Sequence, residues 1–179
     1  MTEEKSIESG LTFDDITLLP NTSHVKSRKD PSLRTGLGRS LLLEIPIINS
    51  PMDSVISDAM ATTLADLGSV PIFDRQYDIT KLYNRKDYLF FISTGINIDF
   101  SVIDKLIDNS CFIGINVDVA NGHSIAAIDT VERIRNRYPY LEIMAGSICT
   151  GEGYKKLVDK GATSVRVGIG NGASCKTRL

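Results

Sequence analysis

From about residue 45 onward, short apolar runs alternate with stretches in which apolar residues recur at helical spacing. The runs are continuous rather than alternating, which is typical of strands that are covered on both faces. They are IPIINS at 45–50, SVPIFD at 69–74, LFFIST at 89–94, FIGINVD at 112–118, LEIMAGS at 141–147 and SVRVG at 164–168. The pattern therefore predicts six strands.

Four amphipathic segments lie between these runs and predict helices over 57–67, 99–109, 124–138 and 151–161. The side chains expected to face the sheet are Met60, Leu64 and Leu67, then Val102, Ile103, Leu106 and Ile107, then Ile128 and Val131 with Ile134 or Ile125, and finally Tyr154, Leu157 and Val158. Pro139 is expected to end the third helix, and Gly161 to cap the fourth.

A repeating strand–helix unit predicts an α/β fold with a parallel sheet and right-handed crossovers. Two architectures fit this repeat: a doubly wound open sheet or a (β/α)₈ barrel. A barrel would be incomplete, because about six of its eight units are present. The polar segment 17–44, which contains prolines and glycines, is expected to cover the bottom of a barrel or to form a small hairpin.

Composition and charge exclude several classes of protein. Apolar residues make up 42% of the chain and charged residues 23%, as in ordinary soluble domains. A net charge of -2 gives no reason to expect nucleic acid or an anionic membrane as a partner. No apolar run is long enough to span a bilayer, and the polar N-terminus MTEEKSIESG is unlike a signal peptide. These features predict a cytoplasmic protein.

The 3 cysteines, Cys111, Cys149 and Cys175, form no C-x-x-C pair, and their odd number argues against a disulfide framework or a zinc site. Candidate chemistry lies instead just after the strands, where active groups of parallel α/β folds are found. Small and polar residues follow all six predicted strands, and the last one leads into the glycine-rich loop GIGNGASC. Glycines there would let the backbone adopt positive φ and approach a ligand closely.

Five motifs in order, LTFDDITLLP, IPIINSPMDSV, DVANGHS, AGSICTGEGY and VRVGIGNGASCKTR, resemble those of the IMP dehydrogenase / GMP reductase family. The resemblance runs from about Leu11 to the last residue. It implies a (β/α)₈ barrel enzyme, a homotetramer that acts on purine nucleotides with NAD or NADPH. On this basis residues 1–44 are expected to be an N-terminal arm and barrel-bottom segment, and 45–179 a partial catalytic barrel. The seventh and eighth strands of the family are absent, which suggests a fragment of a longer protein.

The resemblance also assigns site residues. Cys175 matches the nucleophile that attacks C2 of the purine, Thr177 the threonine that helps to activate water or ammonia, and Arg75 a basic residue near the catalytic centre. The nucleotide side comprises Ser50, Met52, Ala173 and Ser174. The cofactor side comprises Asp118, Val119, Ala120, Ser147, Arg166 and Gly168. A monovalent cation, potassium in the family, would be held by the backbone carbonyls of Gly170, Gly172 and Cys175.

Plainer interpretations stay open for each position. Cys175 could be a passive thiol in a glycine-rich turn, and Asp118 a helix-capping residue at a strand end. Ser50 and Met52 could simply form an X-Pro turn. His123 is expected to be structural rather than a base, and Cys111 and Cys149 to be packing or strand-edge residues.

Several features bear on which member of the family the chain resembles. The absence of an insertion between 74 and 89, together with DVANG, favours GMP reductase, whereas LTFDD and SPMD favour IMP dehydrogenase. Ala173 and Ser147 depart from the serine and asparagine usual at these positions, and Asn171 and Lys176 are also atypical. An alternative of another class is an inactive half-barrel that only binds a nucleotide or a partner.

Overall fold

The computed structural model describes residues 15–171 of the 179-residue chain. The chain divides into two compact units, one formed by Met1–Ser32 with Gly170–Leu179 and the other by Leu33–Ile169. All helices and strands named below belong to the second unit. None of the helices in the described part of the chain is long and apolar enough to cross a membrane.

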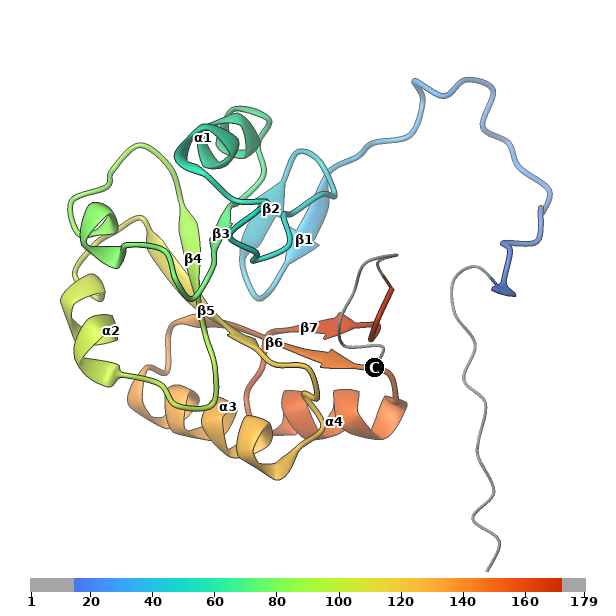
Figure 1. Ribbon diagram of the computed structural model, residues 1–179. Helices are drawn as coiled ribbons and strands as arrows, with labels where there is room; N and C mark the ends of the chain where they lie inside the picture. The colour runs from blue at the N-terminus through green and yellow to red at the C-terminus, as the bar shows by residue number, and fades with distance from the viewer. Residues whose placement is uncertain (1–14, 172–179) are drawn as a thin grey trace, which may run out of the picture. The chain divides into compact units, whose positions relative to one another are not determined.

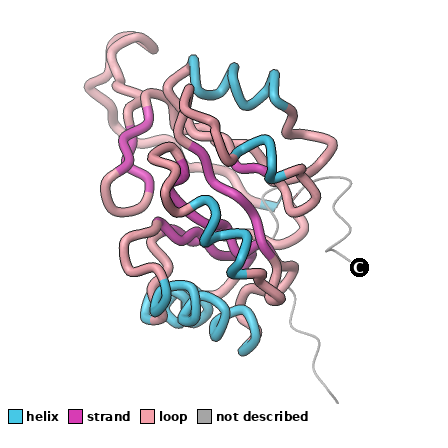
Figure 2. Tube along the Cα trace, turned by 90° about the vertical axis from the view of Figure 1, so that its left-hand side faces the viewer, coloured by secondary structure: helices cyan, strands magenta, loops and turns pink. Residues whose placement is uncertain are grey.

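The second unit begins with an antiparallel hairpin and continues as an alternation of helices and parallel strands (Figures 1 and 2). The hairpin consists of β1 (Thr35–Leu37) and β2 (Leu41–Leu43). The elements that follow are α1 (Asp58–Asp66), β3 (Ile72–Phe73), the short 3-10 helix η2 (Ile79–Leu82), β4 (Phe90–Thr94), α2 (Phe100–Leu106), β5 (Phe112–Asp118), α3 (Ile125–Arg137), β6 (Glu142–Ile148), α4 (Gly151–Asp159) and β7 (Ser164–Val167).

The larger sheet has five parallel strands in the sequential order β3-β4-β5-β6-β7. Helices α1 to α4 lie around one side of this sheet, and the hairpin lies on the other (Figure 1). A doubly wound sheet would reverse its strand order and carry helices on both faces. The α/β class, the parallel pairing and the sequential order are therefore confirmed, and the arrangement is consistent with part of a (β/α)₈ barrel.

The first predicted strand, residues 45–50, is wrong: this segment forms no strand in the structure. The side chain of Asn49 instead pairs with the backbone of Ile72 on the edge strand β3, accepting from its N–H and donating to its C=O, both at 2.8 Å. Pro46 lacks an N–H group, and prolines disfavour regular strand pairing. One side-chain amide thus replaces a neighbouring strand at this edge.

The four helices begin where the sequence predicts, because each follows a residue whose side chain caps it. Ser57, Asp99, Ser124 and Thr150 accept hydrogen bonds from backbone N–H groups in the first turns of α1, α2, α3 and α4. Gly161 has a φ of 105° directly after the C-cap of α4, as expected for a helix end.

The predicted apolar faces of α1 and α4 are partly wrong. Met60 and Leu67 on α1 are 41% and 52% exposed, and Tyr154 and Val158 on α4 are 50% and 40% exposed. Each helix buries a narrower stripe, Ala61 and Leu64 on α1 and Gly153 and Leu157 on α4. The same holds for α2, where the predicted face residue Ile107 is 41% exposed and only Ile103 and Leu106 are buried.

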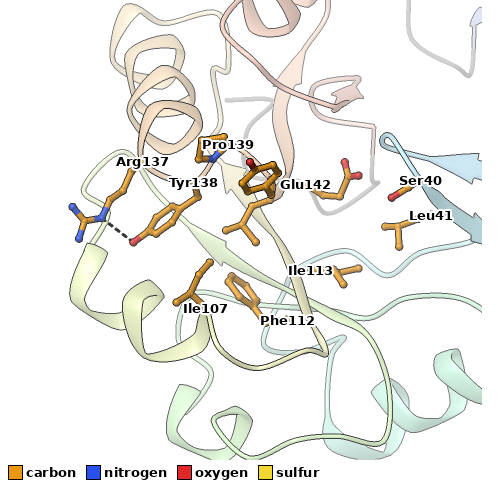
Figure 3. A pocket seen from close by; sticks show the side chains of 11 residues that line it. Ser40, Leu41, Ile107, Phe112, Ile113, Arg137, Tyr138, Pro139 and Glu142 are labelled. Carbon is orange, nitrogen blue, oxygen red and sulfur yellow. Dashed lines mark hydrogen bonds between the residues drawn. The ribbon is translucent and has the colours of Figure 1, made fainter.

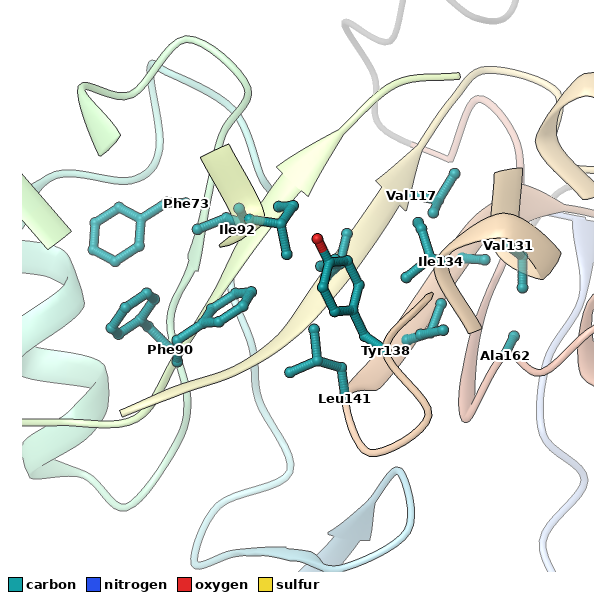
Figure 4. Close-up of a cluster of buried hydrophobic side chains, with 14 of the residues drawn as sticks. Phe73, Phe90, Ile92, Val117, Val131, Ile134, Tyr138, Leu141 and Ala162 are labelled. Carbon is teal, nitrogen blue, oxygen red and sulfur yellow. The ribbon is translucent and has the colours of Figure 1, made fainter. Parts of the chain in front are cut away.

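Alternate residues of the strands supply two separate cores. Phe73, Phe90 and Ile92 point toward the helices, where they join Val131 and Ile134 of α3 (Figure 4). On the opposite face, the strand residues Ile72, Phe91 and Met144 pack with Leu43 of the hairpin and with Val70. The hairpin therefore closes the apolar part of the inner face of the sheet.

Gly114 of β5 is required for the close packing of three strands, and its replacement by alanine should lower stability by about 2 kcal/mol. A Cβ at this position would lie 2.4 Å from the carbonyl oxygen of Glu142 and 2.5 Å from a ring carbon of Phe91. Gly151 is a matched control, because a Cβ there would meet nothing within 4 Å. Urea unfolding of the complete protein measures both variants. Equal changes for Gly114→Ala and Gly151→Ala would contradict the packing argument.

Candidate active site

Polar residues occupy the inner face of the sheet toward the carboxyl ends of its strands. Ser93 of β4 and Asn116 of β5 lie opposite each other in the register, and both are buried. The Asn116 side-chain nitrogen donates to Ser93 Oγ at 3.0 Å. The Asn116 amide oxygen is buried and has no hydrogen-bond partner among the described residues. The inner face thus changes from apolar under the hairpin to polar near the strand ends.

One step nearer the carboxyl ends, Asp118 of β5 forms an ion pair with Arg166 of β7. The two side chains are 23% and 28% exposed. Gly146 of β6 lies between them in the register, and a Cβ there would come within 2.7 Å of Arg166 Cβ. The missing side chain of Gly146 therefore lets Asp118 and Arg166 meet across the intervening strand.

The segments that follow β5 and β6 are joined by backbone hydrogen bonds. The Val119 N–H donates to Gly146 O at 2.9 Å, and the Ser147 N–H donates to Val119 O at 2.8 Å. The Gly122 N–H donates to Ser147 O at 2.7 Å. Val119 and Ser147 are half-buried and Ala120 is exposed. The structure thus brings together five of the six residues expected on the cofactor side: Asp118, Val119, Ala120, Ser147 and Arg166.

The sixth, Gly168, continues this edge. Its N–H donates to Ile148 O at 2.7 Å, and its φ is 117°. Gly170 follows with a φ of 70°. Both are conformations that side chains disfavour, which explains why glycines follow β7. The predicted residues Gly172, Ala173, Ser174, Cys175 and Thr177 lie outside the described residues.

Ser50 and Met52 lie beside the edge strand β3, and both are exposed. Asn49, which is fixed to Ile72, also donates to Ser50 O at 2.9 Å, and the Met52 N–H donates to the same carbonyl at 2.9 Å. A tight turn around the buried Pro51 therefore presents Ser50 and Met52 to solvent. The same hydrogen bonds also satisfy the plainer X-Pro-turn interpretation.

Arg75 follows β3 and is exposed, and its guanidinium passes 3.1 Å from the point where a Cβ on Gly95 would lie. Gly95 directly follows β4, so Arg75 reaches across the neighbouring strand end. Asp74 beside it is buried and accepts from the Gln76 N–H at 2.7 Å, which fixes the turn that carries Arg75. The placement of Arg75 near the catalytic centre stays a prediction.

Residues outside the expected site are partly as predicted. His123 lies against the start of α4, with its Nδ1 3.4 Å from Thr150 Oγ1 and its Nε2 3.9 Å from Glu152. Cys111 packs against the helix-side core, and Cys149 is exposed directly after β6, so the packing role fits Cys111 and the strand-edge role fits Cys149. No group of three or more metal-binding side chains occurs within residues 15–171.

Sequence reasoning missed Asn49, Asn116 and Gly146. Asn116 is the polar residue in the middle of the apolar run FIGINVD, and a buried polar group in a central strand is a signal that could have been used. Gly146 offered no such signal, because its role depends on the side chains of the two flanking strands. Asn49 lies inside a run that has the composition of a strand.

Comparison with known proteins adds to this geometry. Residues 10–88 and 91–179 match the family model described as IMP dehydrogenase / GMP reductase domain. The chain is 33% identical over 174 residues to the GMP reductase of Lactobacillus delbrueckii subsp. bulgaricus, with 93% of this chain and 52% of the relative covered. The GMP reductase of Lactobacillus acidophilus is 32% identical over 174 residues, with the same coverage.

The inosine-5'-monophosphate dehydrogenase of Cryptosporidium parvum is 29% identical over an alignment of 222 residues, which covers 98% of this chain and 55% of the relative. The chain therefore spans about half the length of the curated relatives that it matches. In each case the similarity covers 93% or more of this chain.

Proposed function

Because this chain belongs to the IMP dehydrogenase / GMP reductase family, we propose that the complete protein is a GMP reductase. The observation that carries this choice is the similarity: the relatives named GMP reductase are 31–33% identical, and the IMP dehydrogenase is 29% identical. The short connection between β3 and β4, which contains only the small helix η2, supports the same choice. So does the sequence DVANG at the end of β5.

In the proposed reaction the thiolate of Cys175 adds to C2 of GMP, and the bond from C2 to the exocyclic nitrogen breaks, so that ammonia leaves. When bound, a nicotinamide cofactor, NADPH in this proposal, supplies the hydride that the C2 carbon receives. The bond from C2 to sulfur then breaks, which releases IMP and restores the thiolate. Thr177 would assist the departing ammonia, and Arg75 would lie near the reacting centre.

The described residues fit a cofactor ribose at the ends of β5 and β6. A half-buried carboxylate such as Asp118 accepts hydrogen bonds from hydroxyl groups, and a carboxylate has two oxygens for this purpose. Arg166 occupies Oδ1, so a ribose hydroxyl would bind through the second oxygen. Arg166 would then orient Asp118 rather than compete with the ribose. Val119, Ala120, Ser147 and Gly168 would form the surrounding wall.

The nucleotide would lie on the side of Ser50 and Met52, with Ala173 and Ser174 at its phosphate. The carbonyls of Gly170, Gly172 and Cys175 would hold a monovalent cation, potassium in this proposal. We also propose that the complete protein is a cytoplasmic homotetramer. Sedimentation of the purified protein tests the homotetramer, and removal of potassium during the assay tests the cation site.

IMP dehydrogenase is the second candidate, and the motifs LTFDD and SPMD favour it. In that reaction IMP would lose hydride from C2 to NAD, and water would release XMP from the same cysteine. An inactive, nucleotide-binding remnant is the third candidate. The atypical Ala173 favours it, because alanine cannot donate a hydrogen bond to a phosphate.

An assay of the complete protein separates the three candidates. With GMP and NADPH, a GMP reductase should consume NADPH and release an equal amount of ammonia, and IMP with NAD should give little turnover. Production of NADH and XMP from IMP would establish IMP dehydrogenase instead. Nucleotide binding by calorimetry without turnover in either direction would identify the remnant and refute the proposed enzyme.

A further inference from the structure

The side chain of Asn49 attaches the chain to β3, which lies at one edge of the five-stranded sheet. Its Oδ1 accepts from the Ile72 N–H and its Nδ2 donates to Ile72 O, both at 2.8 Å. The same Nδ2 also donates to Ser50 O at 2.9 Å. One half-buried amide group thus engages the backbone of two separate segments at once.

The segment that begins at Ser50 is the turn that we expect to face the nucleotide. The Ser50 carbonyl accepts from the Met52 N–H at 2.9 Å, and Pro51 between them is buried, so the turn has a defined shape of its own. What connects this turn to the sheet is the path from Ser50 O to the Asn49 amide and from there to Ile72. The amide therefore determines where the turn lies relative to β3.

The same contact relates the turn to Arg75, the basic residue proposed to lie near the reacting centre. Ile72 precedes Arg75 by three positions in the chain. Asp74 between them is buried, and it accepts from the Gln76 N–H at 2.7 Å, which fixes the bend that carries Arg75. A shift of the turn relative to β3 would therefore change the distance between Ser50 and Arg75, two groups that are proposed to face one nucleotide.

From these contacts we propose that Asn49 is a positioning residue for the purine nucleotide, which acts through Ser50 and Met52. The inference rests on the proposed function, because that function places the nucleotide beside these two residues. Groups that bind a ligand must be held close to their productive geometry by the residues behind them. Loss of the Asn49 amide would leave the turn intact but would release it from β3, so the nucleotide should bind more weakly.

Calorimetry with IMP on the complete protein is the primary test. IMP is the product of a GMP reductase and the substrate of an IMP dehydrogenase, so the measurement does not depend on which reaction the protein performs. Asn49→Ala should weaken IMP by about tenfold. In the active enzyme the KM for the purine nucleotide should rise by a similar factor, while kcat and the KM for the nicotinamide cofactor stay within about twofold. General damage to the fold would change all three quantities.

Asn109 is a matched control at the opposite end of the sheet. Its Nδ2 donates to Leu82 O at 2.8 Å and to Tyr83 O at 3.2 Å, and its Oδ1 accepts from the Cys111 N–H at 2.9 Å. It lies near the amino-terminal end of β5, the end that also carries a cavity of about 640 Å³ (Figure 3). Asn109→Ala and Asn49→Ala each remove a side-chain amide that bonds only to backbone, so both should lower the melting temperature. Only Asn49→Ala should weaken IMP.

Asn49→Asp guards against misfolding of Asn49→Ala, because a carboxylate keeps an acceptor for the Ile72 N–H and loses only the donors to two carbonyls. Its loss of IMP affinity should persist in about 0.5 M salt, where an effect of the new charge alone would be screened. Unchanged IMP affinity in both Asn49 variants, or an equal loss in Asn109→Ala, would overturn the proposal. If the unaltered protein did not bind IMP, or bound it only in the cavity of Figure 3, the proposed function would fall and this inference with it.

Discussion

Replacing Cys175 with alanine in the complete protein is expected to abolish turnover, with a loss of several orders of magnitude. The proposed reaction passes through a bond between this sulfur and C2 of the purine, and alanine offers no nucleophile. The direct measurement is mass spectrometry after incubation with 6-chloropurine ribotide. The thiolate should displace the chloride of this compound, so the peptide that contains Cys175 should gain the mass of the nucleotide less hydrogen chloride in the unchanged protein and gain nothing in Cys175→Ala.

The other two cysteines provide the control for this experiment. Of the two cysteines within residues 15–171, Cys149 is exposed and more accessible to a non-specific reagent, whereas Cys111 is half-buried against the core. Cys149→Ala should keep both the adduct and the activity. Labelling at Cys149 or Cys111 in place of Cys175 would refute the assignment of the nucleophile, even if the protein proved to be active.

The second large effect is on stability. Arg135→Ala is expected to lower the free energy of unfolding by about 3–4 kcal/mol. The guanidinium donates to the backbone carbonyls of Tyr138, Pro139 and Leu141 and, through two nitrogens, to Gly161 O at 2.7 and 3.1 Å. It thereby connects the end of α3, the start of β6 and the end of α4. Alanine would remove all of these donors, and only Pro139 O, through Arg39, and Tyr138 O, through the Leu141 N–H, would keep another one shown by the structure.

Burial lowers the pKa of Arg135, and the nearby charge of Arg39 adds to this shift, so the charge is held at some desolvation cost. The hydrogen bonds to the backbone carbonyls more than offset that cost in the folded protein. Removing them with Arg135→Ala should therefore lower the free energy of unfolding substantially. Arg135→Lys should recover little, because an ammonium cannot reproduce the planar fork. Arg133→Ala on the same helix removes an exposed guanidinium 5.3 Å from the Phe100 ring and should cost at most about 1 kcal/mol. Urea unfolding that gives similar losses for Arg133 and Arg135 would contradict the argument.

The sequence predicts the helices and five of the strands because their signals are local. Ser57, Asp99, Ser124 and Thr150 cap helices with their own side chains, and no distant partner is involved. The segment 45–50 has a strand's composition but pairs with β3 through one side chain, a choice that depends on the neighbouring backbone. The exposure of Met60 and Tyr154 likewise depends on how α1 and α4 pack in the folded chain, which local spacing does not determine.

In the candidate site, too, local motifs identify single residues but not the contacts that they make with other strands. Asp118 and Arg166 are identified singly, from their motifs at the ends of β5 and β7. Their ion pair is not predictable from those motifs, because it requires the register of three strands and the absence of a side chain at Gly146. Asn116 stands out as a polar residue in an apolar run, but the contact that accounts for its burial, with Ser93, lies on another strand and is not visible in the local sequence.

The hairpin also bears on the order in which the molecule folds. Each strand of the large sheet pairs with the next strand along the chain, so the sheet can grow unit by unit as the chain is synthesised. The contact from Arg39 to Glu142 spans 103 residues, and closing so long a loop is costly until both ends are ordered. The hairpin, which precedes β6 in the chain, can therefore dock only after β6 has taken its place, which makes it the last part of the inner core to close.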